Sequence, residues 1–306
     1  MSLLTVGTVA FDAIETPFGK TDKIIGGSAT YGSLAASYFT DQVKLVAVVG
    51  DDFPKADIRL LESHGIDTEG LQIKAGEKSF FWSGKYHIDM NSRDTLVTEL
   101  NVLENFDPVI PDSYQGVEYL MLGNLSPQVQ KAVIERLDQR PKLIMMDTMN
   151  FWMDIAMKEL QETISLVDIL SINDAEARQL SGEYSLVKAA KKIMEMGPKT
   201  LIIKKGENGA LLFNGDSVFF APALPLEEVF DPTGAGDTFA GGFIGYLAKT
   251  DDTSFNNMKK AVIYGSALAS FAVEKFGTER IIKISDEEME DRIYRFIDLV
   301  QLEGKF

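Results

Sequence analysis

The residues with the clearest chemical potential form one run, Asp231-Pro-Thr-Gly-Ala-Gly-Asp237. Two glycines around one alanine let the backbone turn sharply and bring its N–H groups together without side chains in the way. A glycine turn that opens a helix can bind an anion, because unpaired N–H groups and the positive end of the helix dipole converge there. Asp237 adds a carboxylate directly beside that turn. The pair suits phosphoryl transfer, in which donors hold the moving charge and a base takes the proton of the acceptor hydroxyl.

The residues after the turn predict the helix that would position it. Phe239, Phe243 and Leu247 recur four residues apart, so we expect a helix over 238–249 with one apolar face. A purely structural explanation also exists, because the helix dipole alone favours an acidic residue such as Asp237 in a first turn. The two aspartates and the small residues behind the turn favour the chemical interpretation.

Residues 231–239, Asp-Pro-Thr-Gly-Ala-Gly-Asp-Thr-Phe, resemble the C-terminal signature of the ribokinase (PfkB) family of carbohydrate kinases. The resemblance implies that Asp237 is the catalytic base. It also implies that the N–H groups of Gly234, Ala235 and Gly236 form an anion hole for the γ-phosphate of ATP, with Thr233 among the residues that bind the nucleotide.

A second resemblance lies near the N-terminus. Gly26-Gly27 followed by small residues is similar to the family's N-terminal signature, but Tyr31 stands where the family usually has an asparagine that contacts substrate. Tyrosine supplies a ring and one hydroxyl in place of an amide, which argues against simple ribokinase specificity. Asp12, beyond a predicted strand over 3–7, stands where family members hold sugar hydroxyls. The resemblance implies substrate contacts from Asp12, Gly26, Gly27 and Tyr31; a turn cap and a plain helix start are the structural alternatives.

Asn173 and Glu176 follow another predicted strand, over 167–172. Their spacing is that of a capping box at a helix N-terminus. The same Asn-x-x-Glu pattern resembles the family motif that orders Mg²⁺ and its waters beside the phosphates. Because magnesium keeps several waters, an amide and a carboxylate acting through water are enough. We expect both roles.

Further residues are expected near ATP because the family places their counterparts there. Lys205, Gly206 and Gly209 form a glycine turn after a predicted strand over 200–204. The predicted helix over 256–276 is rich in small residues, and the family uses this helix in its adenine pocket, which makes Ser266 and Ser270 the expected contacts there. Close packing of another helix would explain the same small residues. A monovalent-cation requirement stays open.

The order of the predicted elements indicates one domain over 1–306. Buried-strand runs alternate with helices, which predicts a three-layer α/β/α fold with a mostly parallel central sheet. The stretch 73–103 is instead rich in antiparallel β signals. The resemblance implies a small β-sheet lid there, with a contribution from 13–25. The aromatic residues of this stretch could cover the substrate, and the other face of the lid could form a homodimer interface.

Composition excludes several classes of function. The net charge of −16 argues against general binding to nucleic acid or to an anionic membrane. There is no cysteine and there are only two histidines, which removes disulfides, thiolate metal sites and histidine-based triads. No long apolar run or signal peptide is visible, so a cytoplasmic enzyme is expected.

We therefore expect an ATP- and Mg²⁺-dependent kinase acting on a hydroxymethyl-type alcohol of a sugar or sugar-like molecule. A nucleoside kinase of the same family is the alternative, since Tyr31 and the aromatic lid could stack on a base. A non-catalytic sensor of sugar or nucleotide would be favoured by degraded motifs, and here they are intact. A dinucleotide-dependent oxidoreductase would need Gly-x-Gly-x-x-Gly after the first strand, which is absent.

Overall fold

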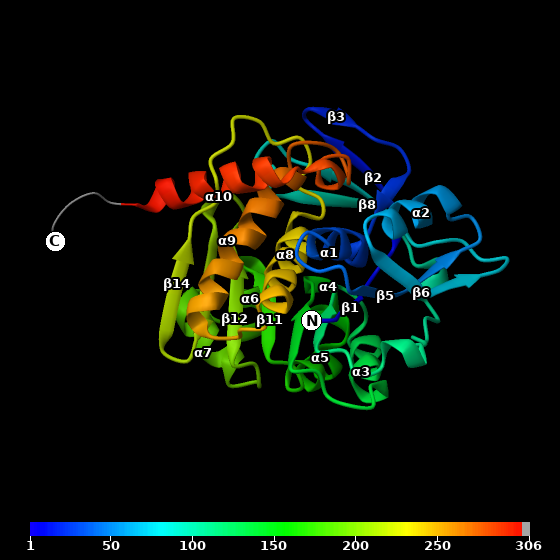
Figure 1. Ribbon diagram of the computed structural model, residues 1–306, viewed down its shortest axis with the longest axis horizontal. Coiled ribbons are helices and arrows are strands. Elements are labelled where there is room, and N and C mark those ends of the chain that lie inside the picture. Colours follow the sequence, from blue (N-terminus) through cyan, green and yellow to red (C-terminus); the bar gives the residue numbers. More distant parts are fainter. Residues whose placement is uncertain (302–306) are drawn as a thin grey trace.

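The computed structural model describes residues 1–301, and its frame is one large sheet (Figure 1). Within these residues the sheet has nine strands in the order β14-β13-β12-β11-β10-β9-β1-β5-β6. All neighbours are parallel except at β13, which runs antiparallel to both β12 and β14. The strands are β1 (Leu3–Val6), β5 (Val43–Gly50), β6 (Ile66–Lys74), β9 (Tyr119–Leu122), β10 (Leu143–Asp147), β11 (Ile169–Asn173), β12 (Thr200–Lys204), β13 (Ala210–Asn214) and β14 (Ser217–Ala221).

Helices cover both faces of this sheet, because successive strand residues point to opposite faces and both sets are apolar. In β5, Leu45 belongs to the core under one helix layer and Val46 to the core under the other. The first layer holds α1 (Ser28–Ala36), α2 (Lys55–Ser63), α8 (Ala235–Thr250) and α9 (Phe255–Ala272). The second holds α3 (Pro127–Arg136), α4 (Asn150–Ile155), α5 (Met157–Ile164), α6 (Asp174–Ser181) and α7 (Leu186–Met194). The three-layer fold expected from the sequence is confirmed.

The last helix, α10 (Asp286–Val300), packs on the outside of the first layer. Phe296 of α10 is fully buried against Ala267 of α9. Short 3₁₀ turns lie at Asn101–Leu103, Asp112–Tyr114, Gly206–Asn208 and Ile281–Lys283. No helix within residues 1–301 is long and apolar enough to cross a membrane.

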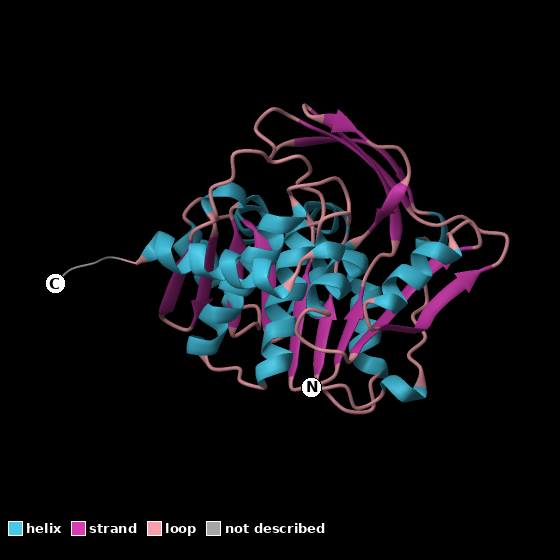
Figure 2. Ribbon diagram, turned by 45° about the horizontal axis from the view of Figure 1, so that its top comes forward, coloured by secondary structure: helices cyan, strands magenta, loops and turns pink. Residues whose placement is uncertain are grey.

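A smaller sheet stands out above the main one (Figure 2). Its strands are β2 (Ala10–Thr16), β3 (Gly19–Lys20), β4 (Ile24–Gly26), β7 (Phe81–Tyr86) and β8 (Arg93–Glu99). They are ordered β3-β2-β7-β8, with β4 paired to β2. The β-rich stretch expected over 73–103 thus supplies β7 and β8, while Ile73 itself belongs to β6, at the edge of the main sheet.

Several predicted boundaries shift. The helix after the glycine turn begins at Ala235 rather than at residue 238, so Asp237 lies within its first turn. The helix predicted over 256–276 ends at Ala272, four residues early. The first strand ends at Val6, one residue before Gly7. The first shift matters for chemistry, because the first-turn N–H groups of a helix have no partner inside the helix.

Candidate active site

Three neighbouring strands of the main sheet end in polar residues at one edge. Asp147 is the last residue of β10, Asn173 of β11 and Lys204 of β12. The strands are parallel, so their carboxyl ends meet. The first turn of α8 lies at the same edge, because a Cβ added to Gly236 would be 3.1 Å from Nζ of Lys204. Strand ends and helix start therefore converge on one site.

The turn that opens α8 requires glycine at its first position. Gly234 is the N-cap and has φ +74°, a left-handed value that favours glycine. The N–H groups of Gly234 and Gly236 have no hydrogen-bond partner among residues 1–301, whereas the N–H of Ala235 donates to the carbonyl oxygen of Pro232 at 3.2 Å. In this conformation two of the three amides expected in the anion hole are open to a ligand, and the third closes the turn.

Asp237 is half-buried beside these amides. Burial, and after it the negative charge of Asp147, raises the pKa of this carboxyl group to about 7, and the positive charges of Lys204 and Arg93 oppose the rise. A carboxyl group with such a pKa can take up and release a proton at neutral pH. That property is the one a general base needs.

Asp12 approaches from the smaller sheet, where it is only 5% exposed. Gly26 leaves room for it, since a Cβ at residue 26 would overlap the Asp12 carboxyl group. Burial, followed by the charges of Asp231 and Asp237, raises the pKa of Asp12 to about 7, and the backbone N–H of Gly27 lowers it. The two aspartates and the glycine pair singled out in the sequence thus lie in one cluster.

Tyr31, in α1, is fully buried beneath the turn. Its ring would overlap a Cβ placed on Gly234. Its hydroxyl oxygen has no hydrogen-bond partner among residues 1–301. Burial, and then the charges of Asp231 and Asp12, raises the pKa of Tyr31 above its ordinary value, so the hydroxyl stays neutral and able to donate. A buried hydroxyl without a partner is costly, and a ligand could supply the partner.

Asn173 and Glu176 form the capping box that their spacing predicted. Oδ1 of Asn173 accepts from the N–H of Glu176 at 2.8 Å, and Oε2 of Glu176 accepts from the N–H of Asn173 at 2.7 Å. Burial and the charge of Asp147 raise the pKa of Glu176 to about 7, while Lys204 lowers it. The cap uses one oxygen of each side chain, so the second oxygen of Glu176 is available. This donor set fits a magnesium ion held through water better than a direct chelate.

Two cations absent from the sequence-based predictions face this cluster. Nζ of Lys204 donates to Oδ2 of Asp147 at 2.5 Å in a largely buried ion pair. Burial lowers the pKa of Lys204, but the charges of Asp147 and Glu176 outweigh it and the ammonium stays charged. Arg93, in β8, opposes the raised pKa of Asp237 and of Glu176. Lys204 ends a predicted strand, which was a usable signal in the sequence; nothing comparable marks Arg93.

The residues expected to bind the nucleotide are less closely grouped. Lys205 directs its Nζ to within 5.8 Å of the ring centroid of Phe220 in β14. Oγ of Ser270 donates to a backbone carbonyl of its own helix and accepts from Nη1 of Arg292 at 2.8 Å, so it joins α9 to α10. Ser266 is half-buried one turn earlier on α9. The structure brings none of these three side chains to the carboxyl cluster, the group formed by Asp12, Asp147, Glu176 and Asp237.

The glycine turn after β12 touches the smaller sheet. Gly206 and Gly209 both have positive φ, +54° and +78°. A Cβ on Gly206 would overlap the side chain of Asn91, which lies between β7 and β8. A second contact joins the sheet to the loop before α8, where Oγ1 of Thr233 donates to the hydroxyl of Tyr86 at 3.2 Å. The smaller sheet therefore contacts both predicted nucleotide segments.

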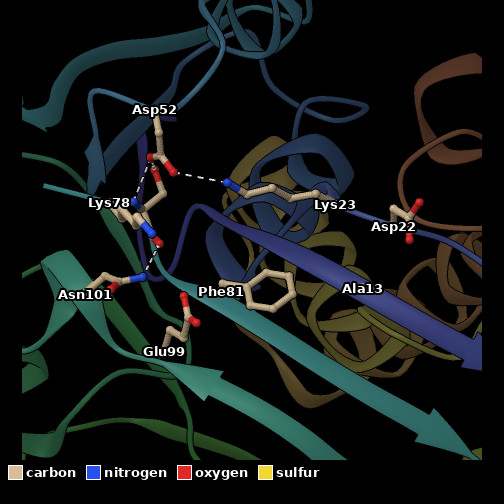
Figure 3. Close-up of a pocket in the computed structure, with 9 residues that line it drawn as sticks. Ala13, Asp22, Lys23, Asp52, Lys78, Phe81, Glu99 and Asn101 are labelled. Atoms are coloured by element: carbon tan, nitrogen blue, oxygen red, sulfur yellow. Dashed lines mark hydrogen bonds and ion pairs between the residues drawn. The ribbon is translucent and has the colours of Figure 1, made fainter.

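A separate pocket of about 320 Å³ lies where the smaller sheet meets the loop after β5 (Figure 3). Its lining includes Ala13 and Phe81, and Lys23 pairs with Asp52 across it at 3.1 Å. Successive strand residues alternate between faces, so Ala13 points away from the face that carries Asp12. This pocket is distinct from the carboxyl cluster.

Comparison with known proteins identifies the family. The model of the pfkB family carbohydrate kinases matches residues 3–284. A cytidine kinase of Thermococcus kodakarensis is 33% identical over 250 residues, which cover 80% of this chain and 87% of that protein. A nucleoside kinase of Methanothermobacter thermautotrophicus is 28% identical over 315 residues, 93% of each chain.

The fold agrees with this assignment. The crystal structure of a nucleoside kinase from Methanocaldococcus jannaschii, an archaeal member of the ribokinase family, superposes with a TM-score of 0.77 at 21% identity. The match covers 96% of this chain and 99% of that one. The resemblance drawn from residues 231–239 is confirmed, and the chain belongs to the PfkB family as a carbohydrate or nucleoside kinase.

Proposed function

We propose that this protein transfers the γ-phosphoryl group of ATP to the hydroxymethyl group of a nucleoside, or of a sugar of similar shape, with Asp237 as the base. One observation carries the proposal: the half-buried Asp237 lies in the first helical turn beside two amides that have no partner among residues 1–301. An acid and an anion site this close suit the removal of a hydroxyl proton while phosphate arrives.

The anion site in this proposal is the turn of Gly234, Ala235 and Gly236. The N–H groups of Gly234 and Gly236 would donate to the oxygens of the γ-phosphoryl group, helped by the positive end of the α8 dipole. The Ala235 N–H would join them only if its 3.2 Å bond to Pro232 opens. In this proposal the turn rearranges as the phosphate binds.

The acceptor would lie between the smaller sheet and the turn. The buried carboxylate of Asp12 can accept hydrogen bonds from sugar hydroxyls, and the partnerless hydroxyl of Tyr31 can donate one. Trp82 is paired with Asp12 across β7 and β2, so it shares the same face of the sheet. An aromatic ring there favours a substrate that carries a base, as do the printed names of the two relatives.

A magnesium ion would be held through water by Glu176, with Asn173 fixing the carboxylate by the capping box. Its role would be to neutralise charge on the phosphates. Lys205, Gly206, Gly209 and Thr233 stay candidates for the nucleotide, together with Ser266 and Ser270. Of these, Ser270 is already bonded to Arg292 and would have to exchange that partner.

The smaller sheet would act as a lid that excludes water from the reaction. Its contacts with Gly206 and Thr233 support this role, because they close the space between the substrate and nucleotide segments. A homodimer through the outer face of this sheet, one domain over 1–306, a cytoplasmic location and a monovalent-cation requirement remain predictions.

An acceptor panel tests the proposal. Purified protein, ATP and Mg²⁺ are incubated with cytidine, adenosine, inosine, ribose, fructose and glucose, and phosphorylated products are identified by mass spectrometry. We expect a nucleoside 5′-monophosphate, with kcat/KM at least about tenfold above that of ribose, the effect of one or two lost contacts. Preference for a free sugar would favour the sugar kinase expected from the sequence. Binding of nucleoside and ATP without any product would indicate the non-catalytic sensor.

A further inference from the structure

The ion pair of Lys204 and Asp147 lies in the carboxyl cluster, and the proposed reaction assigns no role to Lys204. An ordinary surface lysine keeps its ammonium in water, yet this side chain is only 18% exposed and that of Asp147 only 10%. Burying a charged pair is costly unless the geometry is good and the remaining donors find partners. The burial of this ion pair therefore suggests that Lys204 has a function besides stabilising the fold.

Lys204 has more donors than its neighbours use. An ammonium group carries three N–H bonds, and among residues 1–301 the hydrogen-bond acceptor of Lys204 is Oδ2 of Asp147 alone. The other two N–H bonds lie next to the first turn of α8, since Nζ would be 3.1 Å from a Cβ on Gly236. The spare donors are thus beside an amide that also has no partner among these residues.

The charges around the turn also favour a role for the Lys204 ammonium in binding phosphate. Asp12, Asp147 and Asp237 place three carboxyl groups near the turn, close enough for their charges to interact. An ATP γ-phosphate brought to this turn adds further negative charge. Two amides and a helix dipole offer only partial positive charge against it, whereas an ammonium offers a full one.

We propose that Lys204 binds the γ-phosphoryl group of ATP directly, from the side of the main sheet, while Asp147 positions its ammonium. The inference rests on the proposed function and adds a residue to it. The lysine would play the part that a lysine plays in other phosphate-binding loops, a point charge beside backbone donors. Lys204, the last residue of β12, reaches the anion turn, while its neighbour Lys205 lies over Phe220.

The test compares two nucleotides that differ at the γ position. Affinities for ADP and for the non-hydrolysable β,γ-imido analogue of ATP are measured by calorimetry, with Mg²⁺ present, on the full chain. In Lys204→Met we expect affinity for the analogue to fall about 10- to 100-fold, as for a lost hydrogen bond to a charged group. Affinity for ADP should change by less than about threefold, within the scatter of an indirect effect.

Further variants distinguish a loss of nucleotide binding from a loss of folding. Lys204→Met leaves Asp147 buried without its cation, which can be strongly destabilising. The double variant Asp147→Asn/Lys204→Met removes both charges and should show the same selective loss of the analogue. Asp147→Asn alone keeps the ammonium but removes the carboxylate that positions it, so the ratio of analogue to ADP affinity should fall by less than in Lys204→Met. Lys131→Met, in an exposed pair with Glu162 at 3.1 Å, is the matched control and should leave both affinities unchanged.

The outcomes separate this inference from the proposed function. If the double variant keeps the wild-type ratio of analogue to ADP affinity, or loses both affinities equally, Lys204 does not contact the γ-phosphoryl group and the inference is wrong. The proposed function would still stand if wild type phosphorylates an acceptor. If wild type binds neither nucleotide, both fall together.

Discussion

Tyr31 packs directly beneath Gly234, so closely that a Cβ at residue 234 would overlap its ring. The contact joins the two sequence motifs, because Tyr31 follows the Gly26-Gly27 pair in α1 and Gly234 opens α8. Helices α1 and α8 lie side by side in the same layer (Figure 1). A residue expected to touch substrate therefore also supports the turn expected to bind phosphate.

Gly234→Ala should be more damaging than its left-handed φ alone explains. Any alanine at positive φ costs about 1–2 kcal/mol, and overlap with the Tyr31 ring should add about 1–3 kcal/mol of unfolding free energy. The measurement is urea denaturation. Gly215→Ala is the matched control, since Gly215 has φ +56° but nothing within 4 Å of the added Cβ. Equal losses in the two variants would mean that Tyr31 does not pack under the turn.

Tyr31→Phe should separate stability from function. The hydroxyl has no partner among residues 1–301, so its removal should leave the free energy of unfolding unchanged or raise it by about 1 kcal/mol. If the hydroxyl binds the acceptor, KM for the acceptor should rise about tenfold while KM for ATP is unchanged. Denaturation and steady-state kinetics measure the two effects. A large loss of stability with an unchanged KM would give Tyr31 a structural role alone.

The sequence predicted the buried strands best, because a continuous apolar run leaves few alternatives. The bounds expected over 200–204 match β12 at both ends. The edge strand β6 was not anticipated, since only two of its residues are buried and one of these is a glycine. Contacts between residues far apart in the sequence could not be predicted either. Asp147 and Lys204 are 57 residues apart, and only the order of β10, β11 and β12 brings them together.

The candidate site likewise contains residues that could be predicted from the sequence and residues that could not. Asp237, Gly234 and the capping box of Asn173 could be predicted, because each depends on a short local pattern with its own physical cause. Arg93 could not, because its place depends on how β8 pairs with β7 across a turn. Ser270 looked available on a small-residue helix, yet Arg292 of α10 bonds to it, and that packing has no local signal.

The stability of the protein should depend on pH through Asp237. Its folded-state pKa is raised from 3.8 to about 7, so folding favours the protonated carboxyl group. This contribution is fully present below about pH 4 and is lost as pH rises to about 7. Asp237→Asn cannot ionise, so its unfolding free energy relative to wild type should increase across that interval and level off above it. Denaturation of both proteins at pH 5, 6, 7 and 8, without ligands, measures this difference.

A difference that is independent of pH would mean that Asp237 has an ordinary pKa in the folded protein. Glu183→Gln is a suitable control, because Glu183 is paired with Lys192 at the surface and its pKa is lowered through that lysine's hydrogen bond and charge. The control should show no increase between pH 5 and 8, since its titration lies at lower pH.

Activity should follow the opposite trend, because a base must be ionised to accept a proton. With a pKa of about 7 for Asp237, kcat/KM for the acceptor should rise tenfold per pH unit below pH 7 and level off above it. Initial rates between pH 5.5 and 9 measure this profile. A flat profile through pH 7 would assign the titrating proton elsewhere.

The most direct test is the single-turnover rate of phosphoryl transfer in wild type and in Asp237→Asn, with the best acceptor and saturating ATP. The variant keeps the size of the side chain and loses its ability to accept a proton. We expect the rate to fall roughly 10²- to 10⁴-fold, with nucleotide affinity little changed. A variant that transfers phosphate at the wild-type rate would contradict the role of Asp237 on which this account of the site depends.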